Sequence, residues 1–408
     1  MDTFDYVIIG AGTAGSLLAY RLSDNDQHTV CVLEAGPPDR HPFIHIPAGF
    51  TKIINNPAVT WGFNTENSPS INGRSIRIPQ GRTLGGSSSI NGMVYNRGHS
   101  SDYNNWAQLG NPGWSYDDIL PYYKRNERRV GPSDDKFRGR DGRVPVTTPS
   151  WDHTLVQAML RSAVEMGIDR NPDYNGQDYG GSGRYQVNIE RGWRVSSAKA
   201  YLHPAMKRQS VSVQTDVQVT KIVVENGRAV GVRHMPYGGR GNSEVREVRA
   251  RKGVILSAGT VNSPKLLQLS GIGPADLLRE HGIEVVHALE GVGRNLHDHY
   301  GARMVSRVKN TDSLNTRAKG LQLSWEILKW FIGQPSILSL GPATVHAFGK
   351  TDPNAEMPEF VLLCTPGCFK PGLTDLDDFP GMTIGAYPMR PESEGSVRIS
   401  SRALRVNW

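Results

Sequence analysis

The chain has 408 residues, of which 38% are hydrophobic and 21% charged, and its formal net charge is +7. This length favours two or three domains, and this composition is that of a soluble globular protein rather than a disordered or fibrous one. The densest basic stretch, residues 124–143, also carries four acidic residues and few aromatic ones, so we expect a solvated loop and no nucleic-acid partner.

The N-terminal residues 5–36 predict a dinucleotide-binding βαβ unit. They contain, in order, an apolar β run, the glycine turn 10–15, a helical run, a second β run and Glu34. In such a unit Gly10 permits a tight turn, Gly12 lets the backbone approach a pyrophosphate, and Gly15 lets helix and strand pack closely. The helix N-terminus favours the phosphates. Because the Glu34 carboxylate accepts hydrogen bonds from ribose hydroxyls and repels a 2′-phosphate, the unit fits FAD or NAD and not NADP.

A second glycine-rich motif occupies residues 81–95, after a long irregular stretch over residues 37–79. Its small residues let the backbone approach a flat ligand closely, and the amides of residues 85–89 predict an anion-binding nest. Its apolar residues, which include Leu84 and Ile90, argue against a flexible linker.

The middle of the chain predicts three helices. One is a short run ending near Tyr123, and one is amphipathic over residues 152–166. The third ends at Leu202 and is capped by Ser196 or Ser197.

The following residues predict an antiparallel pair, a parallel strand and a helix. The pair covers residues 211–224 and 230–233 and is joined by a further β run at 244–250. Residues 252–257 are apolar throughout, as in a buried parallel strand. The next helix is expected to begin with Ser263 as N-cap and Pro264 as first residue, and to stop at Gly271.

Towards the C-terminus we expect an amphipathic helix over residues 321–332 and strands of a second sheet at 359–363 and 396–399. The two parallel strands of the first sheet lie far apart in the sequence, which indicates a discontinuous domain. We therefore expect a dinucleotide-binding domain from residues 1–150 and 192–300. The substrate domain is expected to comprise residues 151–191 and 301–408.

The three cysteines are too few for a disulfide framework, so a reducing, cytoplasmic location is expected. No metal is expected: Cys364 and Cys368 have no ligand pair nearby, and neither do His297 and His299. Acidic residues precede the first strand, where a signal peptide would be basic. The apolar stretch 327–345 is interrupted by Lys, Gly and Pro, which argues against a transmembrane segment and leaves peripheral membrane contact open.

Three motifs together resemble the glucose–methanol–choline (GMC) flavin oxidoreductases. They are the glycine turn with Glu34, residues 81–91 followed by Tyr95 and Gly98, and residues 259–273. The resemblance runs from residue 5 to about residue 399. It implies an α/β fold with a Rossmann-like FAD-binding domain and an α+β substrate domain on an antiparallel sheet, incomplete at the C-terminus.

By this resemblance the cofactor is FAD. The glycine turn and Glu34 would hold its pyrophosphate and ribose, Thr83 and residues 91–94 would line the flavin side, and the backbone of Val219 would meet the adenine. Some members attach FAD through a histidine where this chain has Ile90, so non-covalent FAD is expected. The expected cofactor-binding residues are Gly10, Gly12, Thr13, Ala14, Gly15, Glu34, Ala35, Thr83, Gly85, Gly86, Ser87, Asn91, Gly92, Met93, Val94 and Val219.

The family oxidises small-molecule alcohols by hydride transfer to flavin N5, with a C-terminal histidine, paired with Asn or His, as base. The last histidine here is His346, and the residues after 401 depart from the family pattern. We therefore expect the catalytic pair to lie beyond Trp408 and assign no catalytic residue.

Three readings follow: a truncated FAD-dependent alcohol dehydrogenase or oxidase, a non-catalytic flavin-binding fragment, and an NAD-dependent dehydrogenase. The last rests on the first motif alone. The alcohol and the electron acceptor, whether oxygen, a quinone or another oxidant, stay open.

Overall fold

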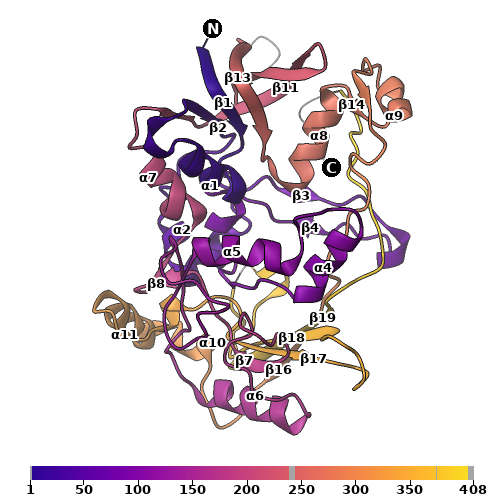
Figure 1. The fold of residues 1–408 in the computed structure, drawn as a ribbon. Coiled ribbons are helices and arrows are strands. Elements are labelled where there is room, and N and C mark those ends of the chain that lie inside the picture. The colour runs from indigo at the N-terminus through magenta and orange to yellow at the C-terminus, as the bar shows by residue number, and fades with distance from the viewer. Residues whose placement is uncertain (1, 239–243, 374, 403–408) are drawn as a thin grey trace.

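Two β-sheets organise the protein, one in the upper and one in the lower half of Figure 1. The computed structural model describes residues 2–238, 244–373 and 375–402. The expected departure from the family pattern at residues 403–408 lies outside the described residues. The mixed α/β architecture with two separate sheets confirms the fold class predicted from the sequence.

The upper sheet has six strands in the order β10-β2-β1-β13-β12-β11. The four strands β10, β2, β1 and β13 are parallel, whereas β12 pairs antiparallel with both β13 and β11. Their bounds are β1 Asp2–Ile9, β2 Val30–Leu33, β10 Val211–Gln214, β11 Val217–Glu225, β12 Arg228–Pro236 and β13 Arg246–Leu256. The carboxyl ends of β1, β2 and β13 therefore meet at one edge, where ligands bind in such sheets.

Two strand predictions need correction. The run expected at 211–224 is two strands, because Asp216 adopts a left-handed φ of 57° and turns the chain between them. The first of these, β10, extends the parallel sheet beside β2 instead of joining the hairpin. The runs expected at 244–250 and 252–257 form the single strand β13, which pairs with β12 over residues 246–249 and with β1 over residues 248–256.

Two helices flank the edge where these strands end. Helix α1 (Thr13–Leu22) follows the glycine turn and buries Gly15, Ser16 and Ala19 against the sheet. Helix α8 (Gly259–Leu269) follows β13 and ends, as predicted, before Gly271 with its φ of 84°.

Helix α8 begins five residues earlier than predicted. Its N-cap is Ala258, and Pro264 lies inside the helix instead of at its start. Pro264 is the sixth residue of α8, so it removes one backbone hydrogen bond of the helix, and the remaining turns still form. The Ser263-Pro264 signal is therefore compatible with a helix that has already begun.

The segments between these elements form short helices and strands. Their bounds are α2 Pro42–His45, α3 Phe50–Ile53, β3 Phe63–Asn64, β4 Arg77–Ile78, α4 Ser100–Gln108, α5 Tyr116–Asn126, β5 Glu127–Arg129, β6 Val144–Val146, β8 Ile189–Glu190, β9 Trp193–Arg194, α7 His203–Ala205, β14 Ile272–Gly273, α9 Ala275–Glu280 and β15 His287–Ala288. Helix α5 confirms the helical run predicted near Tyr123. A helical turn at Ala198–Leu202 confirms the third predicted helix, with the Ser196 hydroxyl accepting from the Lys199 amide at 3.2 Å.

The stretch 124–143 is only partly the solvated loop that its mixed charges predicted: Asp134, Asp135, Lys136, Asp141 and Arg143 are exposed, but other charged residues are buried. Glu127 is fully buried and pairs with Arg97 and with Arg138, whose Nε lies 2.7 Å from Glu127 Oε1. Arg138 also pairs with Asp173. Glu127 and Arg138 are therefore partners of each other inside the protein.

The lower sheet has five antiparallel strands in the order β16-β19-β18-β17-β7. Their bounds are β7 Gly181–Arg184, β16 Ala302–Arg307, β17 Val345–Gly349, β18 Phe360–Thr365 and β19 Gly381–Pro388. Helices α6 (Thr154–Glu165), α10 (Leu314–Arg317) and α11 (Gly320–Phe331) accompany it. The amphipathic patterns at 152–166 and 321–332 thus correspond to real helices.

Residues 396–399 are not a strand of this sheet. They run back to the upper half of the molecule, where the Val397 amide donates to the Gly293 carbonyl at 2.7 Å. The buried side chain of Gln268 on α8 accepts from the Ile399 amide at 2.9 Å and donates to the Val397 carbonyl at 3.1 Å. The alternating pattern predicted a strand, and Ile399 is indeed buried. The backbone of this segment, however, bonds to the side chain of Gln268 and not to a neighbouring strand.

Candidate functional site

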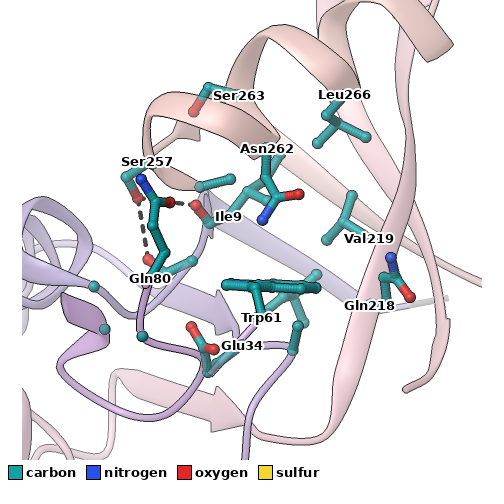
Figure 2. A pocket seen from close by; sticks show the side chains of 18 of the residues that line it. Ile9, Glu34, Trp61, Gln80, Gln218, Val219, Ser257, Asn262, Ser263 and Leu266 are labelled. Atoms are coloured by element: carbon teal, nitrogen blue, oxygen red, sulfur yellow. Dashed lines mark hydrogen bonds between the residues drawn. The ribbon is translucent and has the colours of Figure 1, made fainter. Parts of the chain in front are cut away.

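A cavity of about 440 Å³ opens at the edge where β1, β2 and β13 end, between α1 and α8 (Figure 2). We call it the glycine-turn cavity. It is lined by residues of both predicted glycine motifs and of α8 and β11. The lining residues are Ile9, Gly10, Gly12, Thr13, Ala14, Leu33, Glu34, Ala35, Trp61, Gln80, Gly81, Gly86, Ser87, Val217, Gln218, Val219, Ser257, Ala258, Gly259, Asn262, Ser263, Lys265, Leu266 and Leu269.

The N-terminus of α1 faces this cavity without a side-chain cap. Its N-cap is Gly12, which has no side chain, and Thr13 and Ala14 follow in the first turn. The first N–H groups of a helix have no partner within the helix, and the helix dipole adds positive potential there. These amides are therefore placed to bind an anion at the cavity wall.

The glycines hold this turn in contact with its neighbours. A Cβ on Gly10, whose φ is 94°, would lie 2.6 Å from the Ser257 carbonyl oxygen. A Cβ on Gly15 would lie 1.9 Å from the Gly10 carbonyl oxygen. Both positions exclude any other residue, so the approach of β1, α1 and β13 depends on them.

The second motif packs directly on the first. Gly86 has a φ of 53°, and a Cβ there would lie 2.8 Å from the Gly12 Cα. The Gly85 amide donates to the Ala11 carbonyl at 2.8 Å, and the Ser87 hydroxyl accepts from the Gly81 amide at 3.1 Å. Two stretches that are remote in sequence thus form one wall of the cavity.

Glu34 is buried at the floor of the cavity. Its Oε2 accepts from the Ala11 amide and its Oε1 from the Gly36 amide, both at 2.8 Å. Burial raises the pKa of this carboxyl to about 7. The two backbone hydrogen bonds and the Arg82 charge lower the pKa, but burial has the larger effect. The carboxylate is fixed in position, and its charge changes near neutral pH.

An aromatic wall closes the side of the cavity next to Glu34 (Figure 2). Trp61 stacks on Phe63 with ring centroids 5.6 Å apart and meets Tyr237 edge to face at 5.9 Å. The Arg82 guanidinium lies 4.1 Å from the Tyr237 ring centroid. The ring of Trp61 is thereby held as a flat surface of the kind on which a planar ligand stacks.

Helix α8 and Ser257, which lies just before it, contribute polar groups on the opposite side. The Ser257 hydroxyl is committed to the carbonyls of Ile9 and Gly10, as the dashed lines in Figure 2 show. The Asn262 Nδ2 is buried and has no hydrogen-bond partner within the protein. Burial lowers the pKa of Lys265 to about 8. The Asn262 amide is an orphaned donor of the kind that a ligand satisfies.

The structure brings nine of the predicted cofactor-binding residues to the cavity: Gly10, Gly12, Thr13, Ala14, Glu34, Ala35, Gly86, Ser87 and Val219. Three others, Gly15, Thr83 and Gly85, lie behind its wall. Thr83, for example, is fully buried and donates its hydroxyl to the Pro37 carbonyl.

Residues 91–94 lie apart from the cavity, beyond the 3₁₀ turn Gly86–Ser89. Asn91 Oδ1 accepts from the Met93 amide at 3.0 Å and from Arg194 at 2.8 Å. Met93 has a φ of 60° and packs in a buried cluster with Val187 and Ile189. Gly92 approaches Pro342, and Val94 forms a bridge to Val187.

Sequence reasoning missed Trp61, Gln80, Asn262 and Lys265. Trp61 comes from the irregular stretch 37–79, whose unusual length was the only signal. Asn262 and Lys265 belong to the third motif, but Asn262 was placed before the helix and Lys265 was interpreted as part of the helix body. The earlier start of α8 turns Asn262 towards the cavity.

Within the described ranges, no cluster of three or more His, Cys, Asp or Glu side chains can hold a metal ion. His297 and His299 contact the carbonyls of Pro391 and Met389 at 3.2 and 3.1 Å. No helix in the described part of the chain has both the length and the apolarity that crossing a bilayer requires.

The sequence profile described as GMC oxidoreductase matches residues 4–301. Among curated proteins, the chain is 39% identical over 397 residues to an oxygen-dependent choline dehydrogenase of Brucella anthropi, covering 97% of this chain and 71% of the relative. The enzyme of the same name from Photobacterium profundum is 36% identical, with 98% and 70% covered.

Solved structures with a similar fold are oxidases by name. Pyridoxine 4-oxidase from Mesorbium loti superposes with a TM-score of 0.84 at 28% identity, covering 98% of this chain and 74% of the other. A formate oxidase superposes with a TM-score of 0.88 at 24% identity, over 98% and 75%, which supports the fold alone.

Proposed function

The chain belongs to the GMC oxidoreductase family, and on that premise we propose that it holds FAD in the glycine-turn cavity and oxidises an alcohol to an aldehyde. The family makes it an FAD-dependent enzyme acting on alcohols or choline. The observation that carries the cavity assignment is the uncapped N-terminus of α1, which shares one cavity with the buried carboxylate of Glu34.

The residues at the cavity fit a flavin dinucleotide. The amides of Thr13 and Ala14 supply donors to a pyrophosphate, and Glu34 supplies fixed acceptors to ribose hydroxyls. Trp61 offers a flat face, and the orphaned Asn262 Nδ2 needs an acceptor, which a dinucleotide has in its ring nitrogens, hydroxyls and phosphates. Val219 on β11 is the proposed backbone contact to the adenine.

On the flavin side we propose Thr83 and residues 91–94, with Gly15 and Gly85 supporting the turns behind the wall. When bound, FAD accepts the hydride that the alcohol carbon loses. Ile90 stands where some family members carry a linking histidine, so this chain holds FAD without a covalent bond. Non-covalent binding predicts that acid precipitation releases the flavin completely into the supernatant.

The hydroxyl proton needs an acceptor, and we propose that the described residues do not supply it. None of the residues lining the glycine-turn cavity is a histidine. His346 lies fully buried among Tyr174, Tyr185 and Phe348, and burial lowers its pKa to about 3. Without a positioned base, the rate of oxidation should be lower by about 10²–10⁴-fold.

A panel of primary alcohols, including choline, tests this proposal on the FAD-reconstituted chain. Under anaerobic conditions we expect slow loss of the visible flavin absorbance with at least one alcohol. The rate should rise with pH, because hydroxide replaces the missing base. Absorbance that stays constant with every alcohol would instead favour the second candidate, a flavin-binding protein without turnover.

We further propose the domain division expected from the sequence, with the upper sheet in the FAD-binding domain and the lower sheet in the substrate domain. The partner is then a small-molecule alcohol, and nucleic acid plays no part. A cytoplasmic location agrees with Cys31, Cys364 and Cys368, which are all free and buried.

A further inference from the structure

A second cavity, of about 540 Å³, lies at the end of α1 that is opposite to the glycine-turn cavity. The last turns of α1 and α5 and the loop 135–143 line it, and we call it the basic cavity. Two of its lining side chains are acids and six are cations, namely Arg21, Lys124, Arg125, Arg138, Arg140 and Arg143. No residue lines both cavities, so the basic cavity is independent of flavin binding.

Only two of these six cations have a carboxylate partner in the described part of the chain. Arg140 Nε lies 2.7 Å from Asp135 Oδ1, and Arg138 Nε lies 2.7 Å from Glu127 Oε1. Asp141, the other acid of the lining, is exposed and forms no ion pair within the described ranges. The four cations without an ion pair there are Arg21, Lys124, Arg125 and Arg143.

The contacts of these four side chains orient them without cancelling their charge. The guanidinium groups of Arg21 and Arg143 lie 5.7 and 4.5 Å from the ring centroid of Tyr20. Lys124 Nζ donates to the Lys136 carbonyl at 3.1 Å. An aromatic ring and a carbonyl group carry no net charge. The C-termini of α1 and α5 supply about half a negative charge each, so together they offset about one of the four cations.

The charges buried behind the cavity wall are also unbalanced. The guanidinium groups of Arg97, Arg129 and Arg138 are buried, whereas only two carboxylates, those of Glu127 and Asp173, pair with this group. Arg129 forms no ion pair with any described residue, and burial together with the nearby Arg138 charge lowers its pKa. Arg138 lines the cavity, and its Nη2 is buried with no hydrogen-bond partner among the described residues. An anion in the cavity would therefore offset positive charge on both sides of the wall.

The loop that closes the cavity is packed tightly against α5. A Cβ on Gly139 would lie 1.9 Å from the Lys124 carbonyl oxygen, and a Cβ on Gly142 would lie 2.2 Å from the Asn126 carbonyl carbon. Arg140 Nη1 donates to the Gly131 carbonyl at 2.9 Å. Because this frame is fixed, a ligand does not have to order the loop first, which lowers the cost of binding.

We propose that the basic cavity binds a small molecule that carries phosphate groups. The planar guanidinium group matches phosphate oxygens with two parallel hydrogen bonds, and three of the four uncompensated cations are arginines. Several uncompensated charges call for a ligand with more than one negative charge, which a single carboxylate does not supply. The cations surround one concave site instead of forming a stripe, so the site fits a small ligand better than a nucleic-acid backbone.

Titration calorimetry with inorganic pyrophosphate tests the proposal at low ionic strength, where screening is weakest. Because a pyrophosphate also fits the glycine-turn cavity, the full chain is first incubated with FAD and then freed of unbound flavin. We expect the triple variant Arg21→Gln, Arg125→Gln, Arg143→Gln to bind pyrophosphate about tenfold more weakly or worse, since charged hydrogen bonds are lost.

The matched control is Arg161→Gln, Lys207→Gln, Lys221→Gln, which removes the same net charge from exposed positions elsewhere. It should bind pyrophosphate like the wild type. Pyrophosphate affinity that the first variant retains would place the anion in the glycine-turn cavity or elsewhere and would overturn the proposal. Equal losses in the two variants would also overturn it, because they would show attraction to net charge instead of a site.

Modification of arginines by phenylglyoxal tests the same site on the wild-type chain, without any variant. Pyrophosphate should protect Arg125 and Arg143, which are both exposed, and should leave the exposed Arg161 reactive, as mass spectrometry of the peptides shows. Absence of this protection would contradict the proposal. So would citrate or a duplex oligonucleotide that protects Arg125 and Arg143 at lower concentration than pyrophosphate, because the occupant would then be a carboxylate or a polymer.

Discussion

At the scale of single residues, the most specific prediction about the site concerns Glu34. Its pKa of about 7 lies above the ordinary value because the carboxyl is buried, so the free protein holds a proton there below neutral pH. Ribose hydroxyls need the ionised form as acceptor. Binding of FAD should therefore strengthen as pH rises towards 7 and level off above it, by up to about tenfold per pH unit on the acidic side.

The substitution Glu34→Gln should weaken FAD binding about tenfold or more, because a hydrogen bond to a charged group contributes about 1.5–3 kcal/mol. It should also flatten the pH dependence. Flavin fluorescence quenching between pH 5.5 and 8.5 measures both. Glu225→Gln, at an exposed hairpin end, is the control. Unchanged affinity in Glu34→Gln would remove Glu34 from the site.

Gly86 tests the contact between the two glycine motifs. A Cβ there would lie 2.8 Å from Gly12 Cα, so Gly86→Ala should push the motifs apart and lower both FAD affinity and the unfolding temperature. Gly227→Ala is the matched control, since Gly227 also has a positive φ but meets nothing within 4 Å. It should show only the backbone cost of about 1–2 kcal/mol. Equal losses in the two variants would contradict the contact.

At the scale of elements, the sequence predicted what is local. The run β1, glycine turn, α1 and β2 is encoded within residues 2–33, and the structure confirms it. The parallel position of β10 could not be predicted from the sequence, because it depends on pairing with β2, some 180 residues earlier. The start of α8 was wrong because the cap signal at Ser263 is also compatible with a helix interior. Helix α4 was missed since its capping box uses His99, an unusual N-cap.

Gln268 tests the connection of α8 to residues 397–399. It is fully buried and satisfies the Val397 carbonyl and the Ile399 amide. Gln268→Ala leaves these two backbone groups without partners, which should lower the free energy of unfolding by about 2–6 kcal/mol, from about 1–3 kcal/mol for each group. Urea denaturation measures it. The exposed Gln108→Ala on α4 should cost less than about 0.5 kcal/mol. A small effect at Gln268 would show that the segment does not pack there.

At the scale of the whole molecule, buried charges connect the two proposed domains. Glu127, from the first, pairs with Arg138, which reaches Asp173 in the second. Glu127→Gln leaves buried cations uncompensated and should destabilise the chain by about 3–5 kcal/mol. Glu225→Gln breaks only the exposed pair with Arg249 and should cost about 1 kcal/mol or less. Comparable unfolding temperatures in the two variants would contradict the proposed role of this cluster.

The same scale explains which parts of the site the sequence could predict. The glycine turns and the Glu34 segment carry their chemistry in consecutive residues, so eight of their predicted residues reach the cavity, and Val219, expected from the family resemblance, is the ninth. Trp61 and Asn262 come to it only through tertiary packing, from an irregular stretch and from the second turn of α8. No local sequence pattern predicts that Trp61 or Asn262 lines the cavity.

The most direct test of the account is the absorption spectrum of the purified chain after incubation with excess FAD and removal of free flavin. We predict the visible bands of bound flavin at about one flavin per chain, and their loss in Glu34→Gln or Gly86→Ala. A folded wild-type chain that remains colourless after this treatment would contradict FAD binding in the glycine-turn cavity.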